Sequence, residues 1–171
     1  MSRIDLVQLS PSVLSALAAG DLAAANLAAP ISFSAYFVGP EWRNVWRRRA
    51  AQVADDQASA AWITRAILDV DRGLLVGRAG FHGPPNAAGM VEVGYAIDPA
   101  FRRQGYARAA LIALLKWAKD DASIMTVRAT ISPYNLASRA LVAQYGFVEV
   151  GEQWDDEDGL ETIFEVDAPI E

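Results

Sequence analysis

The spacing of hydrophobic residues changes several times along the chain, and each change predicts a new helix or strand. The segment Ile4–Leu9 has the character of a short strand. Ser10 and Pro11 then supply an N-cap and a first-turn proline for a helix that ends at Gly20. Asp21 can begin a second helix directly afterwards. We therefore expect one strand and two short helices at the start of the chain.

Along the rest of the chain, segments with the helical spacing of hydrophobic residues alternate with segments that have the spacing of strands. A helix is predicted from Pro40 to near Ala58, with Arg47–Arg49 as a solvated helix face. The later elements expected are an antiparallel meander of strands at Trp62–Val70, Gly73–Phe81 and Met90–Ile97, a helix at Gly105–Asp120, a strand at Ile124–Ile131, a helix at Asn135–Tyr145, and strands at Phe147–Gln153 and Leu160–Val166 around an acidic turn. This order predicts an α+β domain with a mixed sheet.

Composition narrows the class of protein. The chain has 171 residues, of which 53% are hydrophobic and 21% charged, and one domain typically takes about 100 to 200 residues. We therefore expect a single domain over residues 1–171. The absence of cysteine excludes disulfides, thiolate metal ligands and a cysteine nucleophile, and it fits a reducing compartment. The expected location is cytoplasmic.

Charge and hydropathy exclude two classes of partner. The 15 Lys and Arg against 21 Asp and Glu give a net charge of −6, the wrong sign for binding phosphate backbones through bulk electrostatics. We therefore expect no nucleic-acid partner. The Ala-rich stretch Val13–Ala29 is interrupted by polar residues and falls short of the ~18 apolar residues of a membrane span. The first residues also lack the pattern of a secretory signal, so no membrane association is expected.

The junction between the predicted strand Met90–Ile97 and the helix after it is the most informative segment. Its loop ends at Gly105, where the first amides of a helix point outward without partners. These amides and the helix dipole favour a pyrophosphate, and Gly105 and Ala107 allow its oxygens to approach the backbone closely. The preceding arginine pair adds positive charge. The spacing matches neither a dinucleotide fingerprint nor a nucleoside-triphosphate loop, which disfavours a dehydrogenase or a kinase.

The loop also resembles that of a known family. Arg102-Arg-Gln-Gly-Tyr-Ala107 is similar to the acyl-CoA pyrophosphate loop of the GNAT superfamily of N-acyltransferases, Arg/Gln-x-x-Gly-x-Gly/Ala. Val91–Ile97 precedes it as the family's fourth strand, and Asn135-x-x-Ser138 with Gly146-Phe147 follows at the family's distance. The resemblance is sharp from Gly73 to Gly151, and the chain looks most like the subgroup that includes ribosomal-protein N-terminal acetyltransferases.

This resemblance implies both a fold and an activity. The fold is a mostly antiparallel seven-stranded sheet with helices on both faces and a V-shaped splay between Met90–Ile97 and Ile124–Ile131. The activity is direct transfer of an acetyl group from acetyl-CoA to an amine, without a covalent acyl-enzyme and without a metal. The cofactor-binding residues it implies are Tyr95, Ala96 and Ile97 along the pantetheine arm, Arg102, Arg103, Gln104, Gly105, Tyr106 and Ala107 at the pyrophosphate, and Asn135 and Ser138.

Glu92 is the expected catalytic base. In a strand it shares a face with Gly94 and Ala96, whose small side chains leave room for a thioester. The alternative is a glutamate at a strand end that pairs with an arginine. His82, the sole histidine, lies in a predicted hairpin turn at Phe81–Pro85, where solvent exposure is the simpler interpretation. We treat His82 as a reserve base.

Two further candidates lie on the helix predicted at Asn135–Tyr145. Asn135 fits a helix N-cap with Ser138 at the third helical position, and the resemblance adds a contact with the pantetheine arm or the catalytic water. The family's tyrosine acid, counted seven residues from Asn135, is replaced here by Val142. Tyr145 falls three residues later, and its role as the acid stays open.

Three functions remain after this reasoning. The favoured one is an amine N-acetyltransferase whose acceptor is a protein N-terminus, a polyamine or an aminoglycoside. The second is a non-catalytic acyl-CoA-binding module, which the missing tyrosine makes conceivable. The third is an interaction domain in which the glycine loop is only the start of a helix, and the Arg102–Ala107 loop argues against it. A homodimer also stays open.

Overall fold

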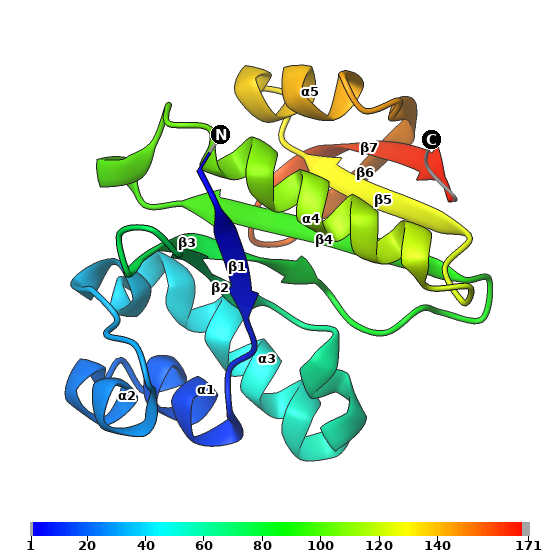
Figure 1. The fold of residues 1–171 in the computed structure, drawn as a ribbon. Helices are drawn as coiled ribbons and strands as arrows, with labels where there is room; N and C mark the ends of the chain where they lie inside the picture. The colour runs from blue at the N-terminus through cyan, green and yellow to red at the C-terminus, as the bar shows by residue number, and fades with distance from the viewer. Residues whose placement is uncertain (1, 169–171) are drawn as a thin grey trace. The chain divides into compact units, whose positions relative to one another are not determined.

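A computed structural model describes residues 2–168 and contains a seven-stranded sheet in the order β1-β2-β3-β4-β5-β7-β6 (Figure 1). The chain forms two compact units. The N-terminal unit runs to Gly80 and adds Tyr95–Leu111, and the C-terminal unit consists of Phe81–Gly94 and the chain from Ile112 onward.

The strands of the N-terminal unit are antiparallel. β1 (Ile4–Val7) pairs with β2 (Arg65–Asp69), and β2 pairs with β3 (Leu74–Phe81), with a register shift after Ile67. The predicted meander of β2 and β3 is thereby confirmed. The tight turn between these two strands is held by a hydrogen bond of 2.8 Å from Gly73 N–H to the Asp69 carbonyl.

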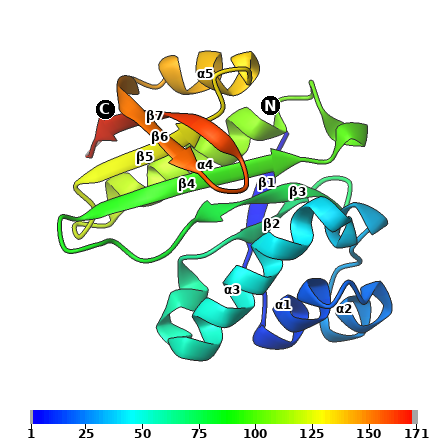
Figure 2. The ribbon, with the colours of Figure 1, turned by 180° about the vertical axis from the view of Figure 1, so that it is seen from behind.

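The first two α-helices of this unit begin where the sequence places their caps. The Ser10 hydroxyl accepts a hydrogen bond from Val13 N–H at 3.2 Å, and the Asp21 carboxylate accepts one from Ala24 N–H at 3.0 Å. These caps open α1 (Pro11–Ala18) and α2 (Leu22–Ala28). α1 packs against α2 and against α3, the long helix in cyan (Figure 2).

The helix predicted from Pro40 to Ala58 is divided into three pieces. The first two are the 3-10 helix η2 (Pro40–Trp42) and α3 (Arg43–Asp55), and a separate 3-10 helix, η1 (Ala35–Val38), lies before them. Asp56 leaves helical geometry, and its side chain caps η3 (Gln57–Ala61) by accepting from Ala58 N–H at 3.0 Å. The carboxylate thus begins a new turn within the predicted helix.

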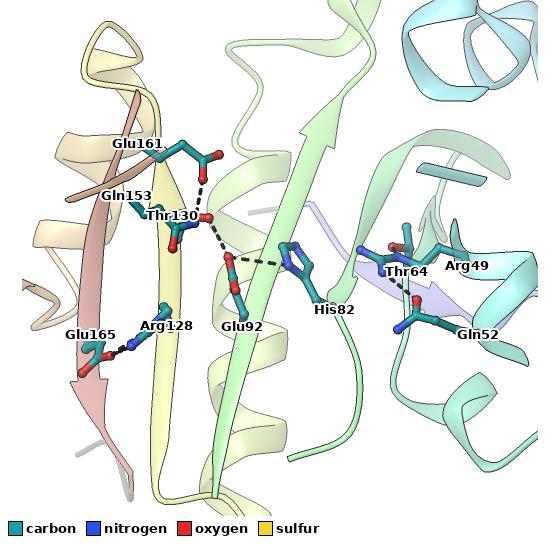
Figure 3. A network of polar contacts seen from close by, with 10 residues as sticks. All are labelled: Arg49, Gln52, Thr64, His82, Glu92, Arg128, Thr130, Gln153, Glu161 and Glu165. Atoms are coloured by element: carbon teal, nitrogen blue, oxygen red, sulfur yellow. Dashed lines mark hydrogen bonds and ion pairs between the residues drawn. The ribbon is translucent and has the colours of Figure 1, made fainter. Parts of the chain in front are cut away.

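The core of the N-terminal unit is apolar and centred on α3. Trp46 is fully buried, and its indole N–H donates to the Phe37 carbonyl at 2.7 Å, so burying the polar edge of the ring costs little. Arg49 corrects one expectation, because it is buried rather than solvated. Its guanidinium donates to Thr64 Oγ1 at 3.0 Å, and burial is tolerated because the charge is hydrogen-bonded (Figure 3).

The strands of the C-terminal unit form a mixed sheet. β4 (Met90–Ile97) runs parallel to β5 (Thr126–Ile131), and the paired residues extend from Met90 with Thr126 to Val93 with Ala129. β7 (Gly159–Asp167) is antiparallel to both β5 and β6 (Val148–Asp155). This arrangement confirms the predicted α+β class and the mostly antiparallel seven-stranded sheet.

Two helices complete the fold. α4 (Tyr106–Asp120) follows β4 through a 3-10 turn, η4 (Pro99–Phe101), and α5 (Leu136–Ala143) follows β5. The predicted apolar stripe of α4 is buried at Leu111, Leu114, Leu115 and Ala118. The helical period therefore identified the side of α4 that faces the interior.

Candidate active site

The loop between β4 and α4 is anchored at its start. The Asp98 carboxylate accepts a hydrogen bond from Ala100 N–H at 2.9 Å, and Arg102 Nε donates to the Ile97 carbonyl at 3.1 Å. After this turn Arg102, Arg103, Gln104 and Gly105 are all exposed. The loop therefore presents its backbone and its arginines to solvent at the start of α4.

Two residues of this loop have left-handed backbone geometry. Arg103 has φ +61° and is the one non-glycine residue with positive φ in residues 2–168, while Gly105 has φ +87°. Such geometry is uncommon for a residue with a Cβ and marks a backbone held in a particular shape. A Cβ on Gly105 would meet open space, so the glycine is required for its conformation and not for room.

This geometry favours an anion. Left-handed residues in a loop turn backbone N–H groups toward one side and make a concave nest, and the start of a long helix adds the positive end of its dipole. Gly105 carbonyl accepts from Ala109 N–H at 3.0 Å, so the helical ladder of α4 begins at the glycine itself. The amides of the first turn are then free of the ladder. The glycine at the start of the helix lies where the sequence predicts it, and its binding of a pyrophosphate stays a prediction.

The side chain of Tyr106 is buried, although its place in the Arg102–Ala107 motif implied a contact with the pyrophosphate. Its side chain is 2% exposed, and its hydroxyl donates to the buried carboxylate of Asp69. Any contact of Tyr106 with a pyrophosphate is therefore through its backbone. The same Asp69 carboxylate accepts hydrogen bonds from Asp71 N–H and Arg72 N–H, each at 3.0 Å. The Tyr106 hydrogen bond and these backbone contacts outweigh desolvation and hold the pKa of Asp69 below its usual range.

Arg72 is a candidate that sequence reasoning missed. Its guanidinium donates to the Tyr106 hydroxyl at 3.3 Å and lies over the Phe101 ring at 5.3 Å from the ring centre. These contacts add a third exposed arginine to the surroundings of the loop. Arg72 lies in the tight turn between β2 and β3, 34 positions before Tyr106 in the sequence. The residues of that turn do not by themselves indicate a contact with Tyr106.

The end of β4 approaches β3 closely in the N-terminal unit. Asp98 N–H donates to the Val76 carbonyl at 2.9 Å. A Cβ on Gly77 would lie 2.3 Å from the Ala96 carbonyl oxygen, so only glycine allows this approach. The backbone at Tyr95–Ile97 that the resemblance assigns to the pantetheine arm is held in place by this contact.

Glu92 lies in the C-terminal unit with two polar partners (Figure 3). Thr130 Oγ1 donates to Glu92 Oε1 at 2.5 Å, and His82 Nδ1 lies 3.6 Å from the same oxygen. Burial raises the pKa of the Glu92 carboxyl, but the contact and charge of His82, then Thr130 and Arg128, outweigh burial and hold this pKa below its usual range.

The strand pattern at Glu92 follows the prediction. Val91 and Val93 are buried, whereas Glu92 and Gly94 on the other face are partly exposed. The alternative interpretation, in which Glu92 pairs with an arginine, is supported only by the nearby charge of Arg128 and not by a hydrogen bond to it. The nearby Arg128 donates to Glu165 instead, at 2.9 and 2.5 Å, and Glu92 uses Thr130 and His82.

His82 fits the expectation of an exposed turn only in part. Its backbone N–H donates to the Glu92 carbonyl at 2.8 Å directly after β3, so the imidazole is held beside Glu92. The side chain is half-buried, with 42% of its surface exposed. The turn lies further along, where Asn86 N–H donates to the Met90 carbonyl at 3.0 Å. The turn predicted at Phe81–Pro85 from its prolines therefore lies too early in the chain.

The α5 candidates have simple structural roles. The Asn135 side chain accepts from Ser138 N–H at 3.1 Å, which confirms the predicted N-cap. Val142, at the place of the family's tyrosine, is fully buried. Tyr145 follows α5 in a turn, with its N–H donating to the Val142 carbonyl at 3.0 Å, and its side chain is half-buried. The catalytic roles of Asn135 and Tyr145 stay predictions.

Neither a membrane-spanning helix nor a metal site is found among the described residues. Over residues 2–168 the helices are all too short or too polar to cross a membrane. Within the same residues, His, Asp and Glu side chains nowhere gather in a group of three that could hold a metal ion.

Comparison with known proteins identifies the family. The model of the acetyltransferase (GNAT) domain matches residues 13–148, which is most of the chain. The chain therefore belongs to the GNAT acetyltransferase family. It is also 33% identical over 88 residues to the uncharacterized N-acetyltransferase YjdG of Bacillus subtilis (strain 168), a match that covers 52% of this chain and 51% of that protein. The chain thus spans about half the length of this relative.

Solved structures support the same fold. The ribosomal-protein-S5-alanine acetyltransferase from Vibrio fischeri has a TM-score of 0.63 and 17% identity, with 97% of this chain and 92% of that chain covered. A dodecameric spermidine N-acetyltransferase from Vibrio cholerae has a TM-score of 0.65 and 15% identity, with 95% and 92% covered. RimJ of Mycobacterium smegmatis in complex with CoA-disulfide has a TM-score of 0.62 and 18% identity, with 96% and 82% covered. At such identities the likeness concerns the fold.

Proposed function

We propose that this protein transfers an acetyl group from acetyl-CoA to a primary amine. The observation that carries the proposal is the exposed loop before α4, in which Arg103 and Gly105 both have left-handed backbone geometry. Strain of this kind in a loop with two arginines is accounted for by an anionic ligand. Because the chain belongs to the GNAT family, we take this anion to be an acyl-CoA.

Several residues would hold the donor. The amides from Gly105 to Ala107 and the side chains of Arg102 and Arg103 would bind the pyrophosphate, with Gln104 at the loop's tip. The backbone of Tyr95–Ile97 would bond the pantetheine arm. Bound acetyl-CoA supplies an activated thioester carbonyl. Because the chain has no cysteine, a thiol-linked acyl-enzyme is excluded, which agrees with direct attack of the amine on the thioester.

Glu92 would accept the proton of the amine. A lysine-like amine with a pKa of ~10.4 costs about 4–5 kcal/mol to deprotonate at pH 7, whereas an α-amine with a pKa of ~7.7–8.0 costs about 1 kcal/mol. Because the pKa of Glu92 is lowered, its carboxylate is a weak base. An acceptor with a weakly basic amine, such as a protein N-terminus, is therefore favoured over a polyamine or an aminoglycoside.

A turnover screen tests this function. Purified protein is incubated with acetyl-CoA and with peptides bearing free N-termini, polyamines or aminoglycosides, and acetylated products are identified by their mass shift. Free CoA can be followed with a thiol reagent without background, since the protein has no thiol. We expect amine-dependent release of CoA, fastest with peptides.

The same screen addresses the non-catalytic alternative. An acyl-CoA-binding module would be stabilised by acetyl-CoA, by about 2.7 kcal/mol at a hundredfold excess over Kd, yet would acetylate none of the amines. Stabilisation without turnover would replace the enzymatic proposal by this one. Absence of both stabilisation and turnover would remove the assignment of the loop.

A further inference from the structure

The side chains of His82 and Glu92 lie beside each other, in a space that a neighbouring glycine leaves open. The imidazole follows β3, the carboxylate lies on β4, and Nδ1 is 3.6 Å from Oε1 (Figure 3). The backbone joins the same two residues, because His82 N–H donates to the Glu92 carbonyl at 2.8 Å. Both the main chain and the side chain of Glu92 therefore lie against His82.

Gly94 provides the space for the ring. A Cβ at this position would lie 2.7 Å from His82 Nε2, closer than real contacts of a Cβ. Gly94 does not have positive φ, so its conformation is open to any residue, and the atoms that a Cβ there would meet belong to the imidazole. Any side chain at position 94 would displace the ring.

Thr130 holds the same carboxylate oxygen that faces His82. Its hydroxyl donates to Glu92 Oε1 at 2.5 Å from the neighbouring strand β5. This bond favours the ionised carboxylate, so Glu92 holds an added proton weakly. A base that holds protons weakly works best when a second group takes the proton from it.

The other charged side chains near this pair have hydrogen-bond partners of their own. On β5 Arg128 is bonded to Glu165 of β7, and on β7 Glu161 accepts from Gln153 of β6 at 2.9 Å. Within the described part of the C-terminal unit, His82 is thus the titratable side chain in direct contact with Glu92. Its imidazole is also 42% exposed, so it reaches solvent.

We propose that His82 is a proton-relay residue that acts through Glu92, a role that rests on the acetyl transfer proposed above. The amine nitrogen bonds to the thioester carbonyl carbon, the carbon–sulfur bond breaks, and CoA leaves as a thiolate. The proton lost by the amine goes to the Glu92 carboxylate. It then passes to neutral His82 at Nδ1, and the imidazolium releases a proton to solvent.

The test compares pH–rate profiles of wild type and His82→Gln. An imidazole must be neutral to accept a proton, so the wild-type rate should rise with pH. The His82→Gln variant should lack this rise and show a kcat about tenfold lower at pH 8, since positioned general bases contribute about 10²–10⁴-fold and His82 acts one step removed. Identical profiles would overturn the relay.

Two further variants separate a relay from a structural role. Added imidazole should restore the rate of His82→Ala, whereas a merely structural histidine would give a deficit that imidazole leaves unchanged. Gly94→Ala added to His82→Gln should cause no further loss, because the ring that it would displace is already absent. Gly151→Ala on β6 is the matched control, because a Cβ there meets nothing within 4 Å, and it should retain wild-type rates.

A measurement without turnover distinguishes failure of the relay from failure of the proposed function. His82 is the one histidine in the chain, so its imidazole gives a unique pair of ¹⁵N signals. Replacing Glu92 by Gln should move the Nδ1 signal at neutral pH. An unmoved signal would overturn the pair whatever the activity. A moved signal in a protein that acetylates no amine would instead overturn the acetyl transfer, and the relay with it.

Discussion

The β4–α4 loop and the surroundings of Glu92 use different parts of the chain for chemistry. The loop acts through backbone, with two left-handed residues in a row of four exposed ones. Around Glu92 the contacts are made by side chains, with Thr130 and His82 both on one oxygen. A site made by the backbone depends on the backbone conformation of its own residues. A site made by side chains depends on the side chains that contact them. The two should therefore respond to different substitutions.

The largest effect is expected from Gly105→Asp. A carboxylate at the start of α4 would compete with the pyrophosphate, and the left-handed geometry disfavours any side chain. Affinity for acetyl-CoA, measured by calorimetry, should fall at least about a hundredfold, which is about 2.7 kcal/mol. Gly105→Ala is the matched control and should lose only about tenfold, from an estimated 1–2 kcal/mol of backbone strain. Equal affinity of Gly105→Asp and wild type would remove the loop from the site.

Glu92→Gln should affect rate and leave binding intact. Gln preserves the size of the side chain and removes its charge, so kcat should fall about a hundredfold while the Kd for acetyl-CoA stays at the wild-type value. The loss should be greatest with amines of high pKa, because these need the base most. Steady-state kinetics with an N-terminal peptide and a polyamine would show it. A variant with wild-type kcat for both acceptors would leave the base unassigned.

Asp69→Asn should give the smallest effect, on stability. The native pKa of Asp69 is below its usual range, so its ionised form stabilises the fold fully above about pH 4 and loses this contribution as pH falls through the native value. Thermal melting should show Asp69→Asn below wild type at pH 7, with the gap closing at lower pH. A gap that stays constant with pH would mean that the Tyr106 contact does not depend on the charge.

Much of the fold could be predicted from patterns among residues that are close together in the sequence. The caps at Ser10, Asp21 and Asn135 lie where their side chains satisfy the first amides of a helix, and this depends on neighbours three residues away. The alternation of Val91 and Val93 with Glu92 likewise follows from the pleat of one strand. Such features are local in sequence, so the sequence predicts them. The division of the predicted helix at Asp56 was missed because its cap competes with helix continuation.

The sequence by itself determined the order of elements, the glycine loop before α4 and the face on which Glu92 lies, because each depends on a few consecutive residues. The partners of those residues were decided only by the tertiary structure. Arg72 and Asp69 reach Tyr106 across more than thirty positions, and Thr130 reaches Glu92 across 38. Contacts of this kind depend on strand order and register, which the spacing of residues along one element does not specify.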